Sequence, residues 1–306
     1  MPEQPRSERR TQNGAFAIMK PTNPIHQANQ RRWDAASASW ARGADSRGTW
    51  RLCPAEPGLV LSGTELHYLA GIAGKRVCVL GSGDNQVVFA LAGLGALVTS
   101  VDISLNQLQV AEERSRELGL SIDFVQADVT DLSVIADDAF DAVYTGGHVA
   151  VWVGDLRQFY AEALRILKPG GLFLCCEYHS FRRIWKASKT RLVVDSRYLD
   201  RGPFEYRYSE NVLSRDPGAF VSYEHHWTIA DYLNATIEAG GQILHADEFG
   251  EEVADWEGAP LQGLPEFLLI VARKEVGPVA AGDVATGPGG AITGPQDHGA
   301  TGRDLG

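Results

Sequence analysis

The sequence lacks an apolar run long enough to cross a membrane, and this excludes one broad class of protein. A membrane-spanning helix needs about 18 or more apolar residues in succession, and no such run occurs among the 306 residues. The stretch MPEQPRSERRTQNGAF at the start carries charges and no apolar centre, so it does not resemble a secretory signal. We therefore expect a cytoplasmic protein that does not bind membranes.

Cysteine is scarce, and its placement argues against disulfides and metal sites. The four cysteines are Cys53, Cys78 and the adjacent pair Cys175 and Cys176. Three of them lie within apolar, strand-like runs, and neither the C-x-x-C nor the H-E-x-x-H spacing of metal sites occurs. We expect reduced cysteines in the core, as in a reducing compartment, and no bound metal.

Positive charge is also limited, because 28 Lys and Arg face 39 Asp and Glu, for a net charge of -11. Proteins that bind nucleic acid usually carry a basic face, whereas the basic clusters here are confined to Arg31–Arg32, Arg182–Arg183 and 186–191. These numbers favour a small-molecule substrate over a nucleic acid. The oligomeric state is left open, with a homodimer as one option.

What the sequence does contain is a regular alternation of strand and helix signals. Short apolar runs predict strands, and the stretches between them have the spacing of helices. The expected strands are 75–81, 96–104, 121–128, 139–147, 172–179, 242–250 and 266–274, and the expected helices are 85–95, 105–120, 155–171 (stopped by Pro169-Gly170-Gly171) and 228–241. Such alternation is typical of a doubly wound α/β fold, with helices on both faces of a mostly parallel sheet.

Three segments fall outside this alternation. Residues 1–24 are polar and 276–306 are rich in Gly, Ala and Pro, so we expect two flexible tails around one domain at 25–275. Residues 180–226 carry many aromatic residues without a clear period, which argues against disorder. We interpret this segment as a cap over the carboxyl ends of the strands, where open α/β sheets bind ligands.

The turn after the first strand, VCVLGSGDNQ, brings a ligand close to the backbone. Dinucleotide folds use G-x-G-x-x-G here, but Gln86 stands in place of the third glycine, and Asp84 would repel a diphosphate. Asp102, about 20 residues on, can accept hydrogen bonds from ribose hydroxyls in either kind of cofactor. Asp128 can accept a hydrogen bond from the amino group of an adenine, and the Val129 N–H can donate to the ring. The acidic glycine turn and this adenine site together favour S-adenosylmethionine, which has a sulfonium and no phosphate.

These motifs resemble, in order and spacing, those of class I S-adenosylmethionine-dependent methyltransferases of the small-molecule type. The resemblance covers about residues 75–180 and rests on VCVLGSGDNQ, VTSVDIS, VQADVTDL, FDAVYTGGHVAVW and ILKPGGLFL. The upstream NQRRWDAASASWA resembles the family's helix that closes over the cofactor. The family implies a Rossmann-like sheet of seven strands in the order 3-2-1-4-5-7-6, with the seventh strand antiparallel.

The resemblance also implies which residues hold the cofactor. The glycine turn would lie under the amino-acid part, the end of the second strand would bind the ribose, and the end of the third would bind the adenine. The family's last turn glycine is replaced by Asn85, so the contacts of this part of the turn stay open. The implied contacts are Gly81, Ser82, Gly83, Asp84, Asn85, Asp102, Ile103, Asp128, Val129 and Gly146.

Candidate catalytic residues follow the fourth and fifth strands. His148 and His179 are placed to line the pocket and to take a proton from the acceptor, and Glu177 could orient His179 or hold an amine. The competing interpretation is that each histidine is a hydrogen-bonded structural residue and that Glu177 pairs with Arg182 or Arg183. The sequence alone does not decide between them.

The sequence as a whole predicts transfer of a methyl group from S-adenosylmethionine to an oxygen or nitrogen atom of a small molecule, releasing S-adenosylhomocysteine. Two alternatives stay open. One is an NAD(P)-dependent oxidoreductase on a similar fold. The other is a protein that binds S-adenosylmethionine without methylating anything.

Overall fold

The computed structural model describes residues 17–18, 21–83, 86–186, 188, 190–208, 220–250 and 259–276. The strands and helices belong to one compact unit, which ends at Glu275. Most of the two expected tails, 1–24 and 276–306, lies outside the described residues, and so do Asp84 and Asn85 of the glycine turn.

Seven strands form the expected sheet. They are β2 (Arg76–Leu80), β3 (Leu97–Asp102), β4 (Ile122–Gln126), β5 (Phe140–Gly146), β6 (Leu167–Tyr178), β9 (Gly241–Phe249) and β10 (Phe267–Lys274). Their order is β4-β3-β2-β5-β6-β10-β9, and β10 runs antiparallel to both of its neighbours. This confirms the predicted order 3-2-1-4-5-7-6. A two-residue strand, β1 (Ala17–Ile18), pairs with β4 inside the segment expected to be a tail.

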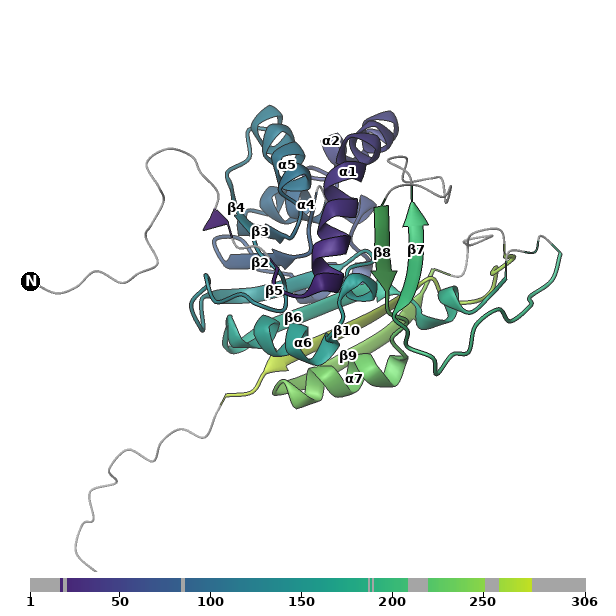
Figure 1. Ribbon diagram of the computed structural model, residues 1–306. Helices are drawn as coiled ribbons and strands as arrows, with labels where there is room; N and C mark the ends of the chain where they lie inside the picture. Colours follow the sequence, from purple (N-terminus) through teal and green to yellow (C-terminus); the bar gives the residue numbers. More distant parts are fainter. Residues whose placement is uncertain are drawn as a thin grey trace, which may run out of the picture. The chain divides into compact units, whose positions relative to one another are not determined.

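Alternating residues of the central strands enter two separate cores. Cys78, Leu80 and Phe173 pack on one face of the sheet, and Val77 and Val79 pack on the other. The first face is covered by α6 (Leu156–Arg165) and α7 (Ile229–Glu238), and the second mainly by α4 (Gln86–Gly93), with α5 (Leu105–Glu117) packed on β3 and β4 (Figure 1). Burial on both sides explains why these strands are apolar almost throughout.

The K-P-G-G motif belongs to a strand rather than to a helix end, which corrects one expectation. Helix α6 already ends at Arg165, and β6 begins at Leu167 instead of residue 172. Phe140 pairs with Leu167 and Ala142 pairs with Leu172, so the residues between bulge out of the ladder. Gly170 adopts φ +78°, a conformation that glycine takes without strain.

The long insertion folds partly as a hairpin that the sequence pattern did not reveal. Within 180–226 the structure describes a 3-10 turn at Ser180–Arg183 and the antiparallel pair β7 (Phe204–Tyr208) and β8 (Phe220–Glu224). The long helix α1 (Pro24–Arg47) lies against β8 (Figure 1). The Asn29 amide fixes this contact, because it bonds both the N–H and the carbonyl of Tyr223 and also the carbonyl of Trp152.

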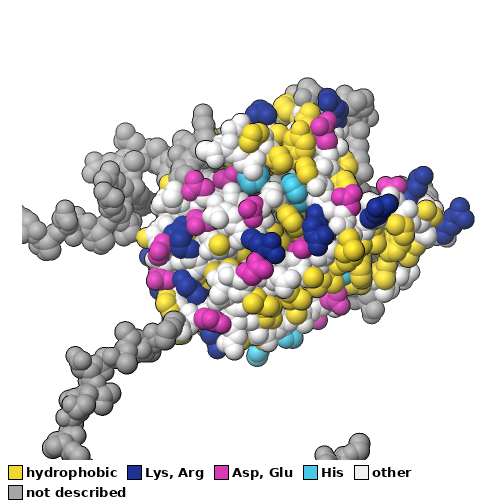
Figure 2. Space-filling model, turned by 60° about the horizontal axis from the view of Figure 1, so that its bottom comes forward, with side chains coloured by type: hydrophobic (Ala, Val, Ile, Leu, Met, Phe, Trp, Pro, Cys, Tyr) yellow, Lys and Arg dark blue, Asp and Glu magenta, His cyan; other side chains and the backbone are white. Residues whose placement is uncertain are grey.

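Among the described helices none is both long enough and apolar enough to span a lipid bilayer. In the view of Figure 2, the Lys and Arg side chains alternate with Asp and Glu over the coloured surface, and they do not gather into one basic area. This distribution agrees with the net charge of -11.

Candidate active site

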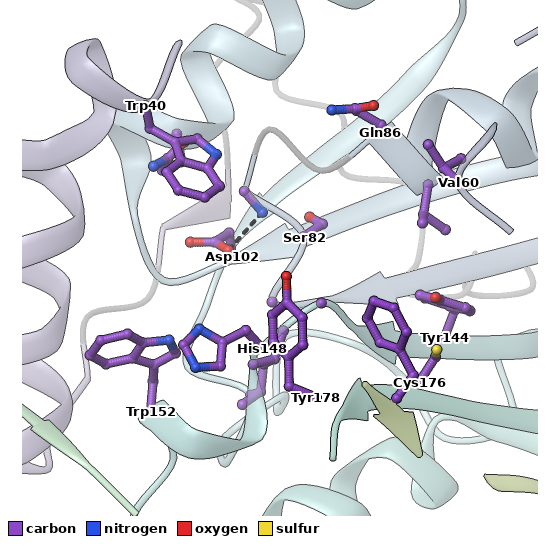
Figure 3. A pocket seen from close by; sticks show the side chains of 18 of the residues that line it. Trp40, Val60, Ser82, Gln86, Asp102, Tyr144, His148, Trp152, Cys176 and Tyr178 are labelled. Carbon is purple, nitrogen blue, oxygen red and sulfur yellow. Dashed lines mark hydrogen bonds between the residues drawn. The ribbon is translucent and has the colours of Figure 1, made fainter. Parts of the chain in front are cut away.

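A cavity of about 710 Å³ lies at the carboxyl ends of β2, β3, β4, β5 and β6. The loops after these strands form its floor, and helix α1 together with the segment 58–65 closes it from above. Figure 3 shows Trp40, Asp102, Ser82, His148, Trp152 and Tyr178 around this space. The described residues of the segment 180–226, which was expected to form the cap, do not line this cavity. The elements that cover it are α1 and 58–65.

The glycine turn is shaped by packing as well as by a ligand's needs. Gly81 has φ +67°, and a Cβ atom there would meet the Val149 side chain at 2.3 Å. The loop after β5 therefore rests directly on the turn. The Gly83 N–H donates to Asp102 Oδ2 at 2.7 Å, and Ser82 Oγ pairs with Ser100 Oγ at 2.5 Å. These bonds hold the turn open toward the cavity.

The carboxyl end of β3 and the start of α5 bring Asp102 and Gln107 to the turn. Asp102 Oδ1 accepts the Ser104 N–H at 2.7 Å, and Ile103 lines the cavity beside it. Gln107, in the first turn of α5, is only 4% exposed and also lines the cavity. Its Oε1 atom accepts no hydrogen bond within the described structure. A buried acceptor without a donor is costly, so Gln107 is suited to a ligand hydroxyl or amine.

The carboxyl end of β4 carries a second acid, with a partner that the sequence reasoning missed. Asp128 Oδ2 lies 2.6 Å from His26 Nδ1, and the Gly154 N–H donates to His26 Nε2 at 2.8 Å. Because Nε2 accepts, Nδ1 carries the proton and donates to Asp128. Burial opposes ionisation of Asp128, but the bonds from His26 and Thr130 more than offset it and lower its pKa. Asp128 and Val129 both line the cavity.

His26 stands just after the expected tail 1–24, and its role depends on tertiary structure. Its partner lies 102 residues away along the chain. The only local signal is the capped helix start T-N-P-I-H, in which Asn23 accepts the Ile25 N–H and Pro24 opens the helix. This signal predicts a helix but not its position over the sheet.

The loop after β5 carries His148, which lines the cavity. Its backbone has φ +89°, and the loop is held by Glu177, whose carboxylate accepts the N–H groups of His148, Val149 and Ala150 at 3.0–3.2 Å. Burial raises the pKa of Glu177 to about 7, and the three N–H donors limit the rise. Burial, with a smaller contribution from Arg183, lowers the pKa of His148 well below its usual value. The imidazole is therefore neutral at pH 7 and carries a lone pair.

The remaining predicted catalytic and methyl-site residues lie outside the cavity lining. Glu177 is 1% exposed and acts on the loop backbone rather than on a ligand. The His179 ring accepts the Phe181 N–H at Nδ1 and lies 2.6 Å from Glu248 Oε1 at Nε2, away from the cavity lining. A Cβ on Gly146 would meet the Cys176 carbonyl, and Gly147 lines the cavity in its place. The geometry thus favours structural roles for these three residues.

The charges of the lining decide which kind of cofactor it suits. Among the residues that the structure describes, three carboxylates line the cavity, on Glu65, Asp102 and Asp128, and one arginine, Arg47, does so from an exposed position. A diphosphate would be repelled by this set, whereas a sulfonium and an ammonium would be attracted. Together with the glycine turn and the buried Gln107 acceptor, these residues fit S-adenosylmethionine better than a dinucleotide. No group of three metal-ligating side chains occurs in the part of the chain that the structure describes.

Sequence comparisons point to the same chemistry. The family profile described as "Methyltransferase domain" matches residues 79–175. Methyltransferase phqN of Penicillium fellutanum is 28% identical over 274 residues, which cover 84% of this chain and 76% of that protein. A demethylmenaquinone methyltransferase of Clavibacter sepedonicus is 40% identical, and a ubiquinone biosynthesis O-methyltransferase of Chromobacterium violaceum is 34% identical. The matched segments cover 36% and 45% of this chain, and 44% and 59% of those two enzymes.

Solved structures give the same result at the level of the fold. An S-adenosylmethionine-dependent methyltransferase from Mesorhizobium loti is 27% identical with a TM-score of 0.51, and the match covers 69% of this chain and 98% of that one. A structure from Listeria monocytogenes, described as a putative S-adenosylmethionine-dependent methyltransferase, is 21% identical with a TM-score of 0.54 and covers 71% and 100%. At 21% identity, the structure from Listeria monocytogenes supports the fold alone.

Proposed function

Since the chain is a class I S-adenosylmethionine-dependent methyltransferase, we propose that it methylates an oxygen or nitrogen atom of a small molecule and releases S-adenosylhomocysteine. The observation that carries this proposal is the neutral His148 imidazole beside the glycine turn, in a cavity lined by carboxylates. The names of the relatives that act on quinone precursors support a small-molecule acceptor. The acidic net charge argues against a nucleic acid.

The cofactor supplies an electrophilic methyl group on a positively charged sulfur. In our proposal the residues at the ends of the strands hold it. Asp102 and Gln107 accept from the ribose side, Asp128 and Val129 face the adenine, and the turn Gly81–Gly83 supports the amino-acid part. The His26 contact with Asp128 ties α1 to this set and covers the cavity.

His148 takes the acceptor's proton in this proposal. An alcohol or a protonated amine must lose a proton to become methylated, and a neutral imidazole within the cavity can accept it. Glu177 positions the loop that carries His148 and does not touch the substrate. In this proposal α1 and 58–65 limit the access of water to the cavity. The acceptor then reacts with the methyl group without competition from water.

The proposal is tested in two steps. Calorimetry with S-adenosylmethionine and S-adenosylhomocysteine measures cofactor binding, and transfer of a labelled methyl group to a panel of phenols and amines measures turnover. His148→Asn is expected to lower kcat by roughly 10²-fold or more while the cofactor Kd stays unchanged. The matched control is His67→Leu, because His67 is exposed and lies outside the cavity.

The outcomes separate the candidate functions. Cofactor binding without any methylated product would favour the non-methylating alternative. No binding of either sulfur nucleoside by folded protein would overturn the proposal. An equal loss of cofactor affinity and turnover in His148→Asn would remove His148 from the role of base and leave it as a cofactor contact.

A further inference from the structure

One wall of the cavity is a continuous row of aromatic rings. Neighbouring ring centroids lie 6.1 Å apart for Trp40 and Trp33, 5.2 Å for Trp33 and Trp152, and 5.6 Å for Trp152 and His148. The row continues from His148 to Tyr178 at 5.3 Å, from Tyr178 to Phe267 at 5.2 Å, and from Phe267 to Phe249 at 5.3 Å. All seven residues line the cavity.

The row comes from distant parts of the chain that the fold brings together. Trp33 and Trp40 lie on α1, Trp152 and His148 on the loop after β5, and Tyr178, Phe249 and Phe267 at the adjoining ends of β6, β9 and β10. Figure 3 shows the rings of Trp152, His148 and Tyr178 on the same side of the cavity, below Ser82. The section from Trp152 to Phe249 therefore contains the proposed base, His148, next to its first ring.

This section offers aromatic surface together with N–H and O–H groups on Trp152, His148 and Tyr178. None of its five side chains carries a charge at pH 7, because burial keeps His148 neutral. The Trp152 indole Nε1 is buried and has no hydrogen-bond partner within the described structure. The rings meet edge to face from Trp152 to Tyr178, at interplanar angles of 76–77°, and stack from Tyr178 to Phe249. Aromatic rings prefer both of these arrangements with one another, so this wall suits an aromatic ligand.

We propose that the methyl acceptor is an uncharged aromatic molecule, with a hydroxyl or amine directed at His148 and its ring in contact with Trp152 and Tyr178, the two neighbours of His148 in the row. This inference rests on the proposed function and adds the substrate class to it. Aromatic contacts of this kind contribute beyond the burial of apolar area. A saturated molecule of the same size and polarity therefore loses that part of the affinity.

The test compares two probes that share one skeleton, 2-naphthol and its saturated counterpart 2-decalol. Calorimetry on protein saturated with S-adenosylhomocysteine is expected to give a Kd for 2-naphthol about 3- to 10-fold lower than for 2-decalol. Tyr178→Leu and Trp152→Leu are expected to abolish most of this preference, and Tyr178→Phe, which keeps the ring, is expected to retain it. Each variant is first titrated with S-adenosylhomocysteine alone, so that misfolded protein is recognised by lost cofactor binding.

The result distinguishes failure of this inference from failure of the proposed function. If the cofactor product binds but 2-decalol binds as tightly as 2-naphthol, or neither alcohol binds, the aromatic acceptor is wrong and the methyltransferase proposal stands. If the preference survives in Tyr178→Leu and Trp152→Leu, the aromatic row does not cause it. If the wild-type protein does not bind S-adenosylhomocysteine, the proposed function fails and this inference fails with it.

Discussion

Gln107 shows how much one side chain can add to a site without belonging to a recognisable motif. Its Oε1 atom is buried in the cavity wall, and no donor reaches it within the described structure. A buried acceptor of this kind is satisfied when a ligand donates to it. Sequence reasoning found Asp102 because an acid at a strand end has a known chemistry. It did not find Gln107, because a glutamine in the first turn of a helix is usually exposed.

Replacing Gln107 by methionine tests this role at the scale of one atom. Methionine keeps the length of the side chain and removes the acceptor, so the Kd for S-adenosylmethionine is expected to rise by a factor corresponding to about 0.5–1.5 kcal/mol. Isothermal titration calorimetry measures the change. Gln158→Met, at an exposed helix position outside the cavity, is the matched control and is expected to bind normally. An unchanged Kd in Gln107→Met would remove Gln107 from the cofactor site.

At the scale of elements, the loop after β5 depends on one carboxyl group. Glu177 accepts three backbone N–H groups of that loop and is fully buried. Burial raises its pKa from 4.5 to about 7. A carboxyl group with a raised folded-state pKa stabilises the fold most at pH values below the unfolded pKa, and this contribution is lost as the pH rises through about 7. Glu177 is therefore expected to contribute more to the unfolding free energy in mild acid than in mild base.

Glu177→Gln isolates this contribution, because glutamine does not titrate. The difference in unfolding free energy between wild type and variant is expected to shrink by roughly 2 kcal/mol between pH 5.5 and pH 8, at about 1.36 kcal/mol per pKa unit. Urea denaturation at the two pH values provides the measurement. A difference that stays constant, or that grows with pH, would show that Glu177 is already ionised at pH 5.5. The bonds from the backbone N–H groups would then lower the pKa of Glu177 more than burial raises it.

The position of α1 depends on contacts that join it to three other elements. His26 bonds Asp128 and Gly154, and Asn29 bonds Trp152 and Tyr223. Removing the His26 contacts with His26→Leu is expected to lower the local opening free energy of the first turns of α1 by about 1–2 kcal/mol. Amide hydrogen exchange reads this out as faster exchange in α1, with α6 unchanged. If α1 exchanges at the wild-type rate, its position is set by packing and by its other hydrogen bonds, such as those of Asn29, Gln30 and Asp34.

The elements that sequence reasoning recovered are those whose pattern is local. Strands β2, β5 and β6 are apolar runs bounded by glycine, and α5 has an amphipathic spacing, so each can be recognised in isolation. The hairpin β7–β8 was missed although F-E-Y-R-Y at 204–208 alternates as a strand does, because the aromatic residues of 180–226 taken together follow no clear period. The K-P-G-G bulge was taken for a helix stop because Pro-Gly serves in both contexts, and only pairing with β5 decides between them.

For the whole molecule, the order of the strands turns scattered residues into one cavity. Only the glycine turn could be assigned from adjacent residues. The partnership of His26 with Asp128, the hold of Glu177 on residues 148–150 and the aromatic row each join residues from separate elements. Because the sheet order was predictable, the carboxyl-end residues could be assigned to one region in advance. Their individual contacts could not, since those depend on where α1 and the loops pack.

Cofactor binding should therefore stabilise the whole fold, because the ligand contacts loops after several strands at once. S-adenosylhomocysteine at 100 times its Kd is expected to add about 2.7 kcal/mol to the unfolding free energy. For a domain of this size that corresponds to a rise in Tm of roughly 5–10 °C, which differential scanning fluorimetry detects. NAD⁺ at the same concentration is expected to leave Tm unchanged, because Glu65, Asp102 and Asp128 face a diphosphate with one exposed arginine as counter-charge. An equal shift with both ligands would mean that the carboxylates do not select against phosphate, and the oxidoreductase alternative would return.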